Sequence, residues 1–336
     1  MKQFEIHEFG IENLALVDRD MPQPGYGEVL VRMRAASLNY RDLMVVKGLY
    51  NPKLRRPIVP LSDACGTVEA VGPGTTRFKP GDRVAGCFMQ RWIDGPPTKD
   101  KAQSALGGAI DGVLRECAVF SEQGLVPVPA YLSDEEAAAL PCAAVTAWHA
   151  LFEHTPAVPG DSVLLQGTGG VSIFALQFAA AAGLKPIITS SSDEKLARAK
   201  KLGAAETINY QSSPEWDEAA RRLTSGEGVG HVVEVGGSGT FERSLRAVRM
   251  GGVVSVIGVL SGVEPVVSPR QILMNSVRLQ GIYVGSRAMF ERMNRFIELH
   301  QIRPVIDRVF GWTEIKDALQ YMESQRHLGK ICLKFA

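Results

Sequence analysis

The sequence predicts an α/β protein with two domains, one a β-rich, barrel-like domain and the other a doubly wound parallel sheet. Three observations lead to this fold class. Short alternating apolar runs separated by Pro and Gly fill the first third of the chain. Apolar runs then alternate with helical segments from residue 162 onward. The 336 residues are enough for two hydrophobic cores.

The first third is strand-rich and interrupted by turns. Glu28–Ala36 alternates apolar and polar residues, which is typical of a half-buried strand. Further strands are expected at 57–61, 66–71, 83–86 and 113–120, with Pro- and Gly-containing turns at 72–74 and 79–82. The polar stretch from about Asp94 to Gly112 is expected to form a loop that shapes the substrate pocket.

A helical segment follows at Ser133–Phe152. Ser133 is expected to cap it, with Glu136 in the position that completes a capping box. Pro141 is expected to kink or split the helix, because proline removes a backbone donor and clashes with the preceding turn.

The region from Gly160 to Tyr210 predicts a dinucleotide-binding unit. It reads as strand, glycine turn, helix, strand, helix and strand, with the turn at Gly167-Thr168-Gly169-Gly170 and a helix from Val171 to Ala182. Glycine lets the backbone approach a pyrophosphate, which the free N–H groups of the helix start then bind. We therefore expect Gly167, Gly169, Gly170 and Val171 to contact the cofactor.

The end of the second strand favours NADP(H) over NAD(H). An NAD-specific fold has an acid there for the ribose hydroxyls, whereas this chain has Ser190 and Ser191, followed by Lys195 in the first helical turn. Serine can donate to a 2′-phosphate and lysine adds positive charge. Ser190 is expected at the exposed end of its strand. Alternatively, Ser191 only caps the next helix, with Glu194 completing a capping box.

The strand–helix alternation continues to residue 284 and then returns to a mixed tail. Strands are expected at 207–209, 231–235, 253–257 and 277–284, which completes six. A helix at 288–300, a short strand, a helix at 313–325 and a strand at 330–335 are expected to pack on the N-terminal domain.

Composition limits the classes of partner. The net charge is +1 and no basic run stands out, so nucleic acid is not favoured. No apolar stretch is long enough to span a bilayer, and the N-terminal residues do not read as a signal peptide. Five scattered cysteines without paired spacing indicate reduced thiols and a cytoplasmic location.

Several segments together resemble the medium-chain dehydrogenase/reductase superfamily, and most closely its zinc-independent branch of quinone oxidoreductases. They are SLNYRDL at 37–43, FKPGDRV at 78–84, ALPCAAVTAW at 139–148, the glycine turn with Ser172, and Gly329-Lys330. The resemblance implies a GroES-like catalytic domain at 1–126 and 285–336, a Rossmann domain at 127–284, and an active site between them.

The resemblance also implies that the catalytic zinc of the alcohol dehydrogenases is lost. Matched motif to motif, the first cysteine ligand is Asn39, the Gly-His-Glu segment is Leu61-Ser62-Asp63, and only Cys142 keeps a thiol. One ligand cannot hold zinc, which needs three protein ligands and an open position. Cys142 then reads as a small buried residue, and we expect no metal.

Without a metal, hydride transfer is easiest to an acceptor that stabilises negative charge itself, such as a quinone or an α,β-unsaturated carbonyl. The protein then supplies orientation and a hydrogen-bond donor to the carbonyl oxygen. The candidates for catalysis are Asn39, Tyr50, Asp42 and Asp63. Alternatively, Asn39 is a turn residue, Tyr50 only packs, and the two acids hold backbone or cofactor hydrogen bonds.

The resemblance places further cofactor contacts, and it implies a homodimer or a dimer of dimers through the edge strand of the Rossmann sheet. Arg287 is alternatively a solvated surface charge. The additional cofactor positions are Thr146, Tyr210, Gly236, Gly258, Val259, Leu260, Ser286 and Arg287.

The main functional hypothesis is NADPH-dependent reduction of a quinone or enone. Two alternatives stay open: an alcohol or aldehyde dehydrogenase of the same fold, and an NADPH-binding sensor or RNA-binding protein without turnover. Bound zinc would favour the first alternative, and tight NADPH binding without reduction of any acceptor would favour the second.

Overall fold

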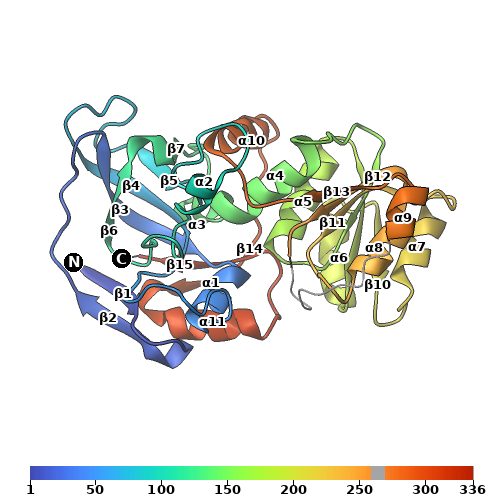
Figure 1. Cartoon of the computed structure of the whole chain (residues 1–336), viewed down its shortest axis with the longest axis horizontal. Helices are drawn as coiled ribbons and strands as arrows, with labels where there is room; N and C mark the ends of the chain where they lie inside the picture. The colour runs from blue at the N-terminus through green and yellow to red at the C-terminus, as the bar shows by residue number, and fades with distance from the viewer. Residues whose placement is uncertain (259–268, 336) are drawn as a thin grey trace. The chain divides into compact units, whose positions relative to one another are not determined.

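The computed structural model describes residues 1–258 and 269–335, and the chain divides into two compact units (Figure 1). Unit 1 consists of Met1–Val145 and Val284–Ala336, and unit 2 of Thr146–Tyr283. The first boundary therefore falls later than the predicted residue 126. The reason is that helix α3 (Asp134–Ala138) packs on strands β3 and β4 of unit 1.

Unit 1 is built on a seven-stranded sheet with the order β14-β15-β3-β4-β5-β7, in which β6 also pairs with β3. The antiparallel pairing of β15 with β3 confirms that the C-terminal tail packs on the N-terminal part of the chain. A separate hairpin joins β1 and β2. The strands are β1 (Lys2–Ile6), β2 (Leu14–Asp18), β3 (Glu28–Ser37), β4 (Asp63–Val71), β5 (Arg83–Gly86), β6 (Cys117–Ser121), β7 (Leu125–Pro127), β14 (Ile306–Gly311) and β15 (Lys330–Lys334).

Two strand predictions in unit 1 need correction. The segment 57–61 forms only an isolated bridge between Ile58 and Ile6, because Pro57 and Pro60 have no N–H to donate to a ladder. The segment 113–120 forms a strand only from Cys117 onward. Before it, the N–H groups of Val113 and Leu114 donate to Pro60 O instead of to a neighbouring strand.

The predicted helix at 133–152 forms and is split at Pro141, as expected. Ser133 and Glu136 make the capping box of α3, a π-helical turn (Leu140–Ala144) contains Pro141, and α4 (Val145–Phe152) follows. Apart from Val145, α4 belongs to unit 2. Besides α3, the helices of unit 1 are α1 (Tyr40–Val46), α2 (Lys99–Ala102), α10 (Arg287–Leu299) and α11 (Ile315–Glu323), with 3-10 turns at Ile11–Asn13, Glu122–Gly124 and Trp312–Glu314.

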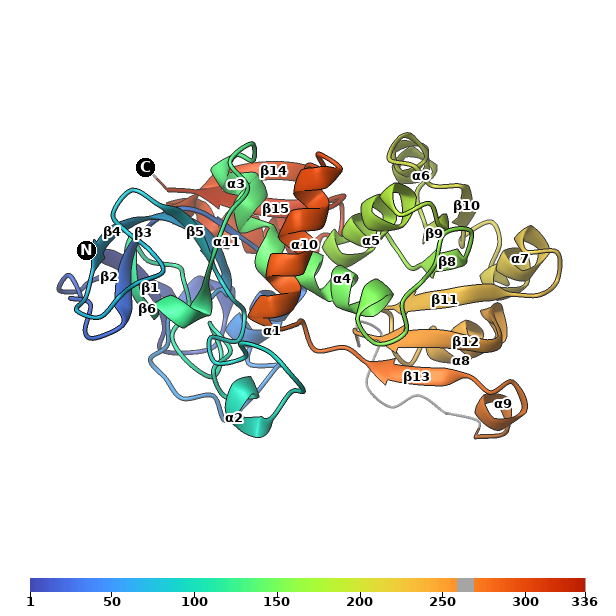
Figure 2. The same cartoon turned by 90° about the horizontal axis from the view of Figure 1, so that it is seen from above.

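Unit 2 is a six-stranded parallel sheet with the order β10-β9-β8-β11-β12-β13, which is the predicted doubly wound topology. Figure 2 shows β11, β12 and β13 of this sheet side by side, with β13 at the edge. The strands are β8 (Ser162–Leu165), β9 (Lys185–Ser190), β10 (Glu206–Asn209), β11 (Val229–Glu234), β12 (Val248–Val256) and β13 (Arg278–Gly281); the helices are α5 (Gly170–Ala181), α6 (Asp193–Lys201), α7 (Trp216–Leu223), α8 (Phe241–Ala247) and α9 (Pro269–Met274).

Each unit has its own hydrophobic core. In unit 1, Trp312 stacks on Phe335 at a centroid distance of 5.0 Å and meets Phe4 edge-on at 5.7 Å. In unit 2, residues of the central strands such as Leu164, Val232 and Val254 form the core. Within the part of the chain that the structure describes, no helix is long and apolar enough to cross a membrane.

Candidate active site

Asn39 stands at the N-cap of α1, between the end of β3 and the first helical turn. Its backbone N–H donates to Asp42 Oδ2 at 2.8 Å, which is half of a capping box and satisfies one of the free donors at the helix start. Asp42 is fully buried and Asn39 is partly exposed. Asp42 therefore holds a backbone hydrogen bond at the helix start, and the amide oxygen of Asn39 is bonded to Lys330 instead.

Lys330, at the start of β15, reaches this amide from the far end of the sequence. Its Nζ donates to Asn39 Oδ1 at 2.6 Å and to Leu38 O at 2.7 Å, and lies 3.9 Å from Asp63 Oδ2. The residue is only 3% exposed. A nearly buried ammonium therefore sits among an amide, a carbonyl and a carboxylate, which is a well-compensated position for a charge.

Asp63 and its neighbours complete a polar network, which we call the Lys330 network: Asn39, Asp42, Ser62, Asp63 and Lys330. Asp63 Oδ1 accepts from the Ser62 hydroxyl at 2.7 Å, and Asp63 Oδ2 accepts from the Cys142 N–H at 3.1 Å. Ser62 Oγ in turn accepts from Asn39 Nδ2 at 3.4 Å. The structure thus brings together three of the four predicted catalytic residues, and it places Asp63, like Asp42, on a backbone donor.

Burial dominates the ionisation of this network. It raises the pKa of Asp42 to about 6, against the opposing effect of the Arg41 guanidinium. It also raises the pKa of Asp63, although Lys330 and the Ser62 hydroxyl counteract it. Burial and the neighbouring Asp63 carboxylate raise the pKa of the Cys142 thiol, which keeps the thiol protonated.

The positions that match the family's zinc ligands do not fit a zinc ion. They come together as expected, but they offer an amide, a hydroxyl, a carboxylate and a protonated thiol, and the Lys330 ammonium already occupies the amide oxygen. Zinc prefers thiolate, imidazole and carboxylate ligands, and a cation beside it is repelled. In residues 1–258 and 269–335, no group of three His, Cys, Asp or Glu side chains is arranged to hold a metal.

Tyr50, the fourth predicted catalytic residue, lies on the exposed side of this region and is 42% exposed. The Arg41 guanidinium lies over its ring at 5.3 Å and over the Phe88 ring at 4.9 Å. Arg41 Nη1 also donates to Leu106 O at 2.7 Å, so Arg41 ties α1 to the predicted loop at 94–112. That loop carries α2 and helps to line a cavity of about 490 Å³ with Leu106, Ile110 and Asp111.

In unit 2, the glycine turn has the geometry that a pyrophosphate needs. Gly167 has φ +68°, and Gly169 is the N-cap of α5. A Cβ built on either glycine meets nothing within 4 Å, so open space faces the turn. Ser172, in place of the third glycine, is buried and donates to Gln166 O at 2.6 Å. The turn therefore fits the phosphates of a nicotinamide dinucleotide.

The serines at the end of β9 and just beyond it are placed differently from the prediction. Ser190 is 3% exposed rather than at an exposed strand end, because it is still part of β9, paired with Asn209 of β10. Ser192, not Ser191, caps α6 by accepting from Lys195 N at 3.3 Å. Ser191 and Tyr210 are exposed.

A buried carboxylate in unit 2, Glu234, was missed by the sequence reasoning. Its Oε1 accepts from Gly236 N at 2.8 Å, Gly237 N at 2.9 Å and Thr240 Oγ1 at 2.6 Å. Its Oε2 accepts from Gln166 Nε2 at 2.7 Å and from the Ser244 hydroxyl. These donors come from the ends of β8 and β11 and from α8, so Glu234 joins the glycine turn to the predicted Gly236 turn. An acid as the last residue of an apolar strand, followed closely by two glycines, is the signal that could have revealed it.

The remaining residues predicted to contact the cofactor differ in their burial and in their hydrogen bonds. Thr146 is buried, Ser286 caps α10 by accepting from Met289 N at 3.2 Å, and Gly258 lies close to Val235 O. Val259 and Leu260 lie outside the described residues. None of these contacts with a cofactor is tested by the structure, and they stay predictions.

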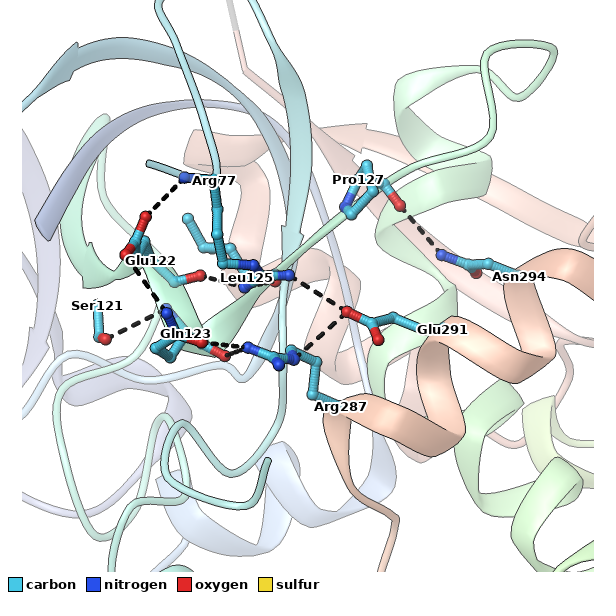
Figure 3. Close-up of polar contacts among 9 residues, drawn as sticks. All are labelled: Arg77, Ser121, Glu122, Gln123, Leu125, Pro127, Arg287, Glu291 and Asn294. Carbon is cyan, nitrogen blue, oxygen red and sulfur yellow. Dashed lines mark hydrogen bonds and ion pairs between the residues drawn. The ribbon is translucent and has the colours of Figure 1, made fainter. Parts of the chain in front are cut away.

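Arg287 is engaged within unit 1, as Figure 3 shows. Its Nη1 donates to Gln123 Oε1 at 2.6 Å, and its Nε lies 3.3 Å from Glu291 Oε1, which also pairs with Arg77 at 3.2 Å. With 17% of its side chain exposed, Arg287 is not a solvated surface charge. Its contacts hold α10 against the turn at Glu122–Gly124.

Comparisons with known proteins agree with this architecture. Residues 25–130 match the alcohol dehydrogenase GroES-like domain and residues 170–299 the zinc-binding dehydrogenase family. A zinc-type alcohol dehydrogenase-like protein of Schizosaccharomyces pombe is 47% identical, covering 97% of this chain and 96% of the relative.

Two solved structures extend the likeness. The structure of a putative alcohol dehydrogenase from Sinorhizobium meliloti has a TM-score of 0.93 and 41% identity, covering 99% of this chain and 98% of its own. A quinone oxidoreductase from Pseudomonas syringae has a TM-score of 0.84 and 30% identity, covering 99% of both chains. This chain therefore belongs to the zinc-type alcohol dehydrogenase-like oxidoreductases of the medium-chain dehydrogenase/reductase superfamily.

Proposed function

We propose that this oxidoreductase transfers hydride from NADPH, without a metal, to a quinone or an α,β-unsaturated carbonyl. One observation carries the proposal: the Lys330 ammonium bonds to Asn39 Oδ1 where the family's zinc ligands would lie. An alcohol substrate needs a Lewis acid or a base to stabilise its alkoxide, whereas a quinone or enone delocalises the negative charge itself. The Pseudomonas quinone oxidoreductase gives an example of such a substrate class on this fold.

The nicotinamide cofactor supplies the hydride when it is bound. Transfer of that hydride to the β-carbon of an enone would leave NADP⁺ and an enolate whose negative charge lies on the carbonyl oxygen, and a solvent proton would complete the reduction. Asn39 is partly exposed and has amide hydrogens to donate, so it stabilises the charge that develops on that oxygen. Tyr50, which is more exposed, is a second donor to the same oxygen.

The choice of NADPH rests on the residues after β9. Ser190 and Ser191 stand where an NAD-specific fold has an acid, and the first carboxylate, Asp193, accepts from Asn209 Nδ2 at 2.6 Å. Lys195 lies one turn into α6 and adds a positive charge near the expected 2′-phosphate. The turn at Gly167–Gly170 would hold the pyrophosphate.

The decisive experiment measures initial rates of NADPH and NADH oxidation with benzoquinones, naphthoquinones and enones, before and after EDTA treatment. The proposal expects turnover with NADPH that survives EDTA, in a protein that contains far less than one zinc per chain. Loss of activity in EDTA that zinc restores would contradict it. NADPH binding without reduction of any acceptor would favour the sensor alternative.

An alcohol or aldehyde dehydrogenase is the second candidate, and the names of the Schizosaccharomyces and Sinorhizobium proteins favour it. This reading requires a zinc site that the donors of the Lys330 network do not provide. Oxidation of a panel of primary and secondary alcohols with NADP⁺, alongside zinc analysis of the same sample, distinguishes the two.

We also propose a homodimer through the edge strand β13. In the sheet order of the described residues β13 is the last strand and pairs with β12 alone. Exposed apolar side chains of Leu273, Met274 and Leu279 lie on β13 and the adjoining α9. Light scattering on the eluting protein is expected to give twice the chain mass, and replacing Leu279 with Lys is expected to shift it toward the monomer.

A further inference from the structure

We propose that Lys330 is a positioning residue that orients and polarises the Asn39 amide, so that a cation built into the chain acts where relatives use a metal. This inference rests on the proposed function, because it assigns a role in the same reaction. It goes beyond that function in naming how the hydrogen-bond donor is set up. It differs from a purely structural ion pair in acting through one neighbouring side chain.

The ammonium group determines which way the amide points. An ammonium has three donors and no acceptor, so the Asn39 atom at 2.6 Å from Nζ has to be the oxygen. The amide nitrogen then faces the other way, with one hydrogen directed to Ser62 Oγ at 3.4 Å. The Asn39 side chain also hydrogen-bonds to the Asp63 carboxylate, so the N–H side of the amide faces the Ser62–Asp63 pair and not Lys330. The orientation of the amide is therefore imposed by Lys330.

The same contact strengthens the amide as a donor. A charged donor on the amide oxygen draws electron density from the N–H groups, and hydrogen bonds in a chain polarise one another in a low-dielectric site. Lys330 is nearly buried, so solvent screens this effect only weakly. The effect grows as negative charge develops on the substrate oxygen, which is the condition for lowering a reaction barrier.

Asp63 and Leu38 hold the ammonium in place. The Leu38 carbonyl accepts from Nζ at 2.7 Å, and the Asp63 carboxylate lies 3.9 Å away with its own oxygens bound to Ser62 and Cys142. Lys330 is thus aimed at Asn39 rather than paired closely with Asp63. Lys330 Nζ is hydrogen-bonded to Asn39 Oδ1 at 2.6 Å but lies 3.9 Å from Asp63 Oδ2. This difference in distance distinguishes a positioning role from a simple salt bridge.

The test is a double-mutant cycle of Lys330→Met and Asn39→Ala on the full-length protein, with kcat, KM and the NADPH Kd measured for each. Lys330→Met alone is expected to lower kcat about 30-fold with the NADPH Kd changed less than threefold. In the Asn39→Ala background the same change is expected to lower kcat less than threefold, because its route is gone. An equal loss in both backgrounds, or a loss in NADPH affinity alone, would overturn the proposal.

Three further variants separate a loss of this contact from misfolding. Lys334→Met, on the same strand but with its side chain 69% exposed, is the matched control and should leave kcat unchanged. If Lys330→Met unfolds because Asp63 loses its partner, the pair Lys330→Met with Asp63→Asn removes both charges and carries the test. Lys330→Arg also presents only donors and is expected to recover part of kcat.

An amide NMR readout separates this inference from the proposed reaction. The chain has six asparagines, so ¹⁵N-asparagine labelling gives few side-chain signals, and Asn39→Ala identifies the one of interest. Its NH₂ shifts are expected to move toward solvent-exposed values in Lys330→Met. Movement without turnover of any acceptor would retain the Lys330 contact and reject the function; turnover with no movement would do the reverse.

Discussion

In unit 1 an ammonium is buried near two carboxylates, Lys330 with Asp63 and Asp42, whereas in unit 2 the carboxylate of Glu234 is buried among neutral donors. Both clusters lie where strands end, and both join segments that are distant in sequence. The carboxylate oxygens of Glu234 accept five hydrogen bonds from two turns and a helix. By contrast, among the residues that the structure describes Asp42 Oδ1 has no hydrogen-bond partner, and Arg41 Nη1 lies 3.7 Å from it.

The difference indicates what each cluster is for. A buried carboxylate with all its bonds satisfied by neutral donors fixes the shape of the backbone around it, which suits a turn that must receive phosphates. A buried group of charges with raised carboxyl pKa values and an incompletely bonded oxygen costs stability, and such costs concentrate where chemistry takes place. The predictions below test this contrast between a reactive cluster and a scaffolding cluster.

The largest expected effect is on catalysis, from Asn39→Ala. Loss of one preorganised donor to a developing oxyanion typically lowers kcat by about 10²- to 10³-fold. The capping bond from the Asn39 backbone to Asp42 is kept, but the buried Lys330 ammonium loses an acceptor, so the melting temperature should fall and kcat is compared well below it. Steady-state kinetics with the best acceptor provides the measurement. Asn13→Ala, at an exposed asparagine that donates to Phe9 O, is the matched control. Unchanged kcat would remove Asn39 from the mechanism.

The second prediction concerns pH and Asp42. Burial raises its pKa from 3.8 to about 6, so the folded state binds this proton more tightly than the unfolded state does. The resulting stabilisation is complete below about pH 4 and is lost as the pH rises through about 6. At 1.36 kcal/mol per unit, the wild type should lose about 3 kcal/mol relative to Asp42→Asn between about pH 4 and pH 7.

Urea unfolding of the two proteins across this pH range is the measurement. Arg41, Asp63 and Lys330 face Asp42 and are present in both proteins, so their own titration largely cancels in the difference. A difference that stays constant with pH would mean that Asp42 does not bind a proton more tightly in the folded protein.

The scaffolding cluster is expected to respond through stability. Glu234→Gln turns one acceptor into a donor that faces other donors, and leaving buried donors unpaired costs about 1–3 kcal/mol. We expect a loss of about 2 kcal/mol in unfolding free energy together with weaker NADPH binding. Glu218→Gln, at an exposed helix position, is the control. If kcat falls while stability and NADPH affinity hold, the division of roles between the clusters is wrong.

Local sequence signals predicted the scaffold better than the reactive cluster. The strand alternation, the Ser133–Glu136 capping box and the break at Pro141 are all read within a few residues, and the structure confirms them. The contact of Lys330 with Asn39 joins residues 291 positions apart, and no local pattern encodes it. Motif matching did place Asn39 and Asp63 near each other, although it left Lys330 without a role.

Burial was the other quantity that local patterns misjudged. The Ser190 side chain was expected at an exposed strand end, but pairing of Ser190 with Asn209 encloses it. Glu234 falls within the predicted strand 231–235 but was given no role, and two turns and α8 supply the donors to its buried carboxylate. In both cases residues from outside the residue's own strand set the exposure: Asn209 of β10 for Ser190, and Gln166 and Ser244 for Glu234.

The smallest expected effect concerns cofactor choice, and it has to be tested at Ser191 rather than at Ser190. An aspartate at the buried Ser190 would confound repulsion of the phosphate with the cost of burying a charge. Ser191→Asp places the charge at an exposed position beside the expected 2′-phosphate. Near the surface, this repulsion amounts to about 1–2 kcal/mol, so kcat/KM for NADPH should fall about tenfold, and that for NADH less than twofold.

Ser324→Asp, at an exposed serine of unit 1, is the control for the added charge itself. Because the effect is electrostatic, it should shrink as salt is raised. A loss that is equal for both cofactors, or independent of salt, would show that the serines after β9 do not read the phosphate, and the preference for NADPH would then have to come from elsewhere in unit 2.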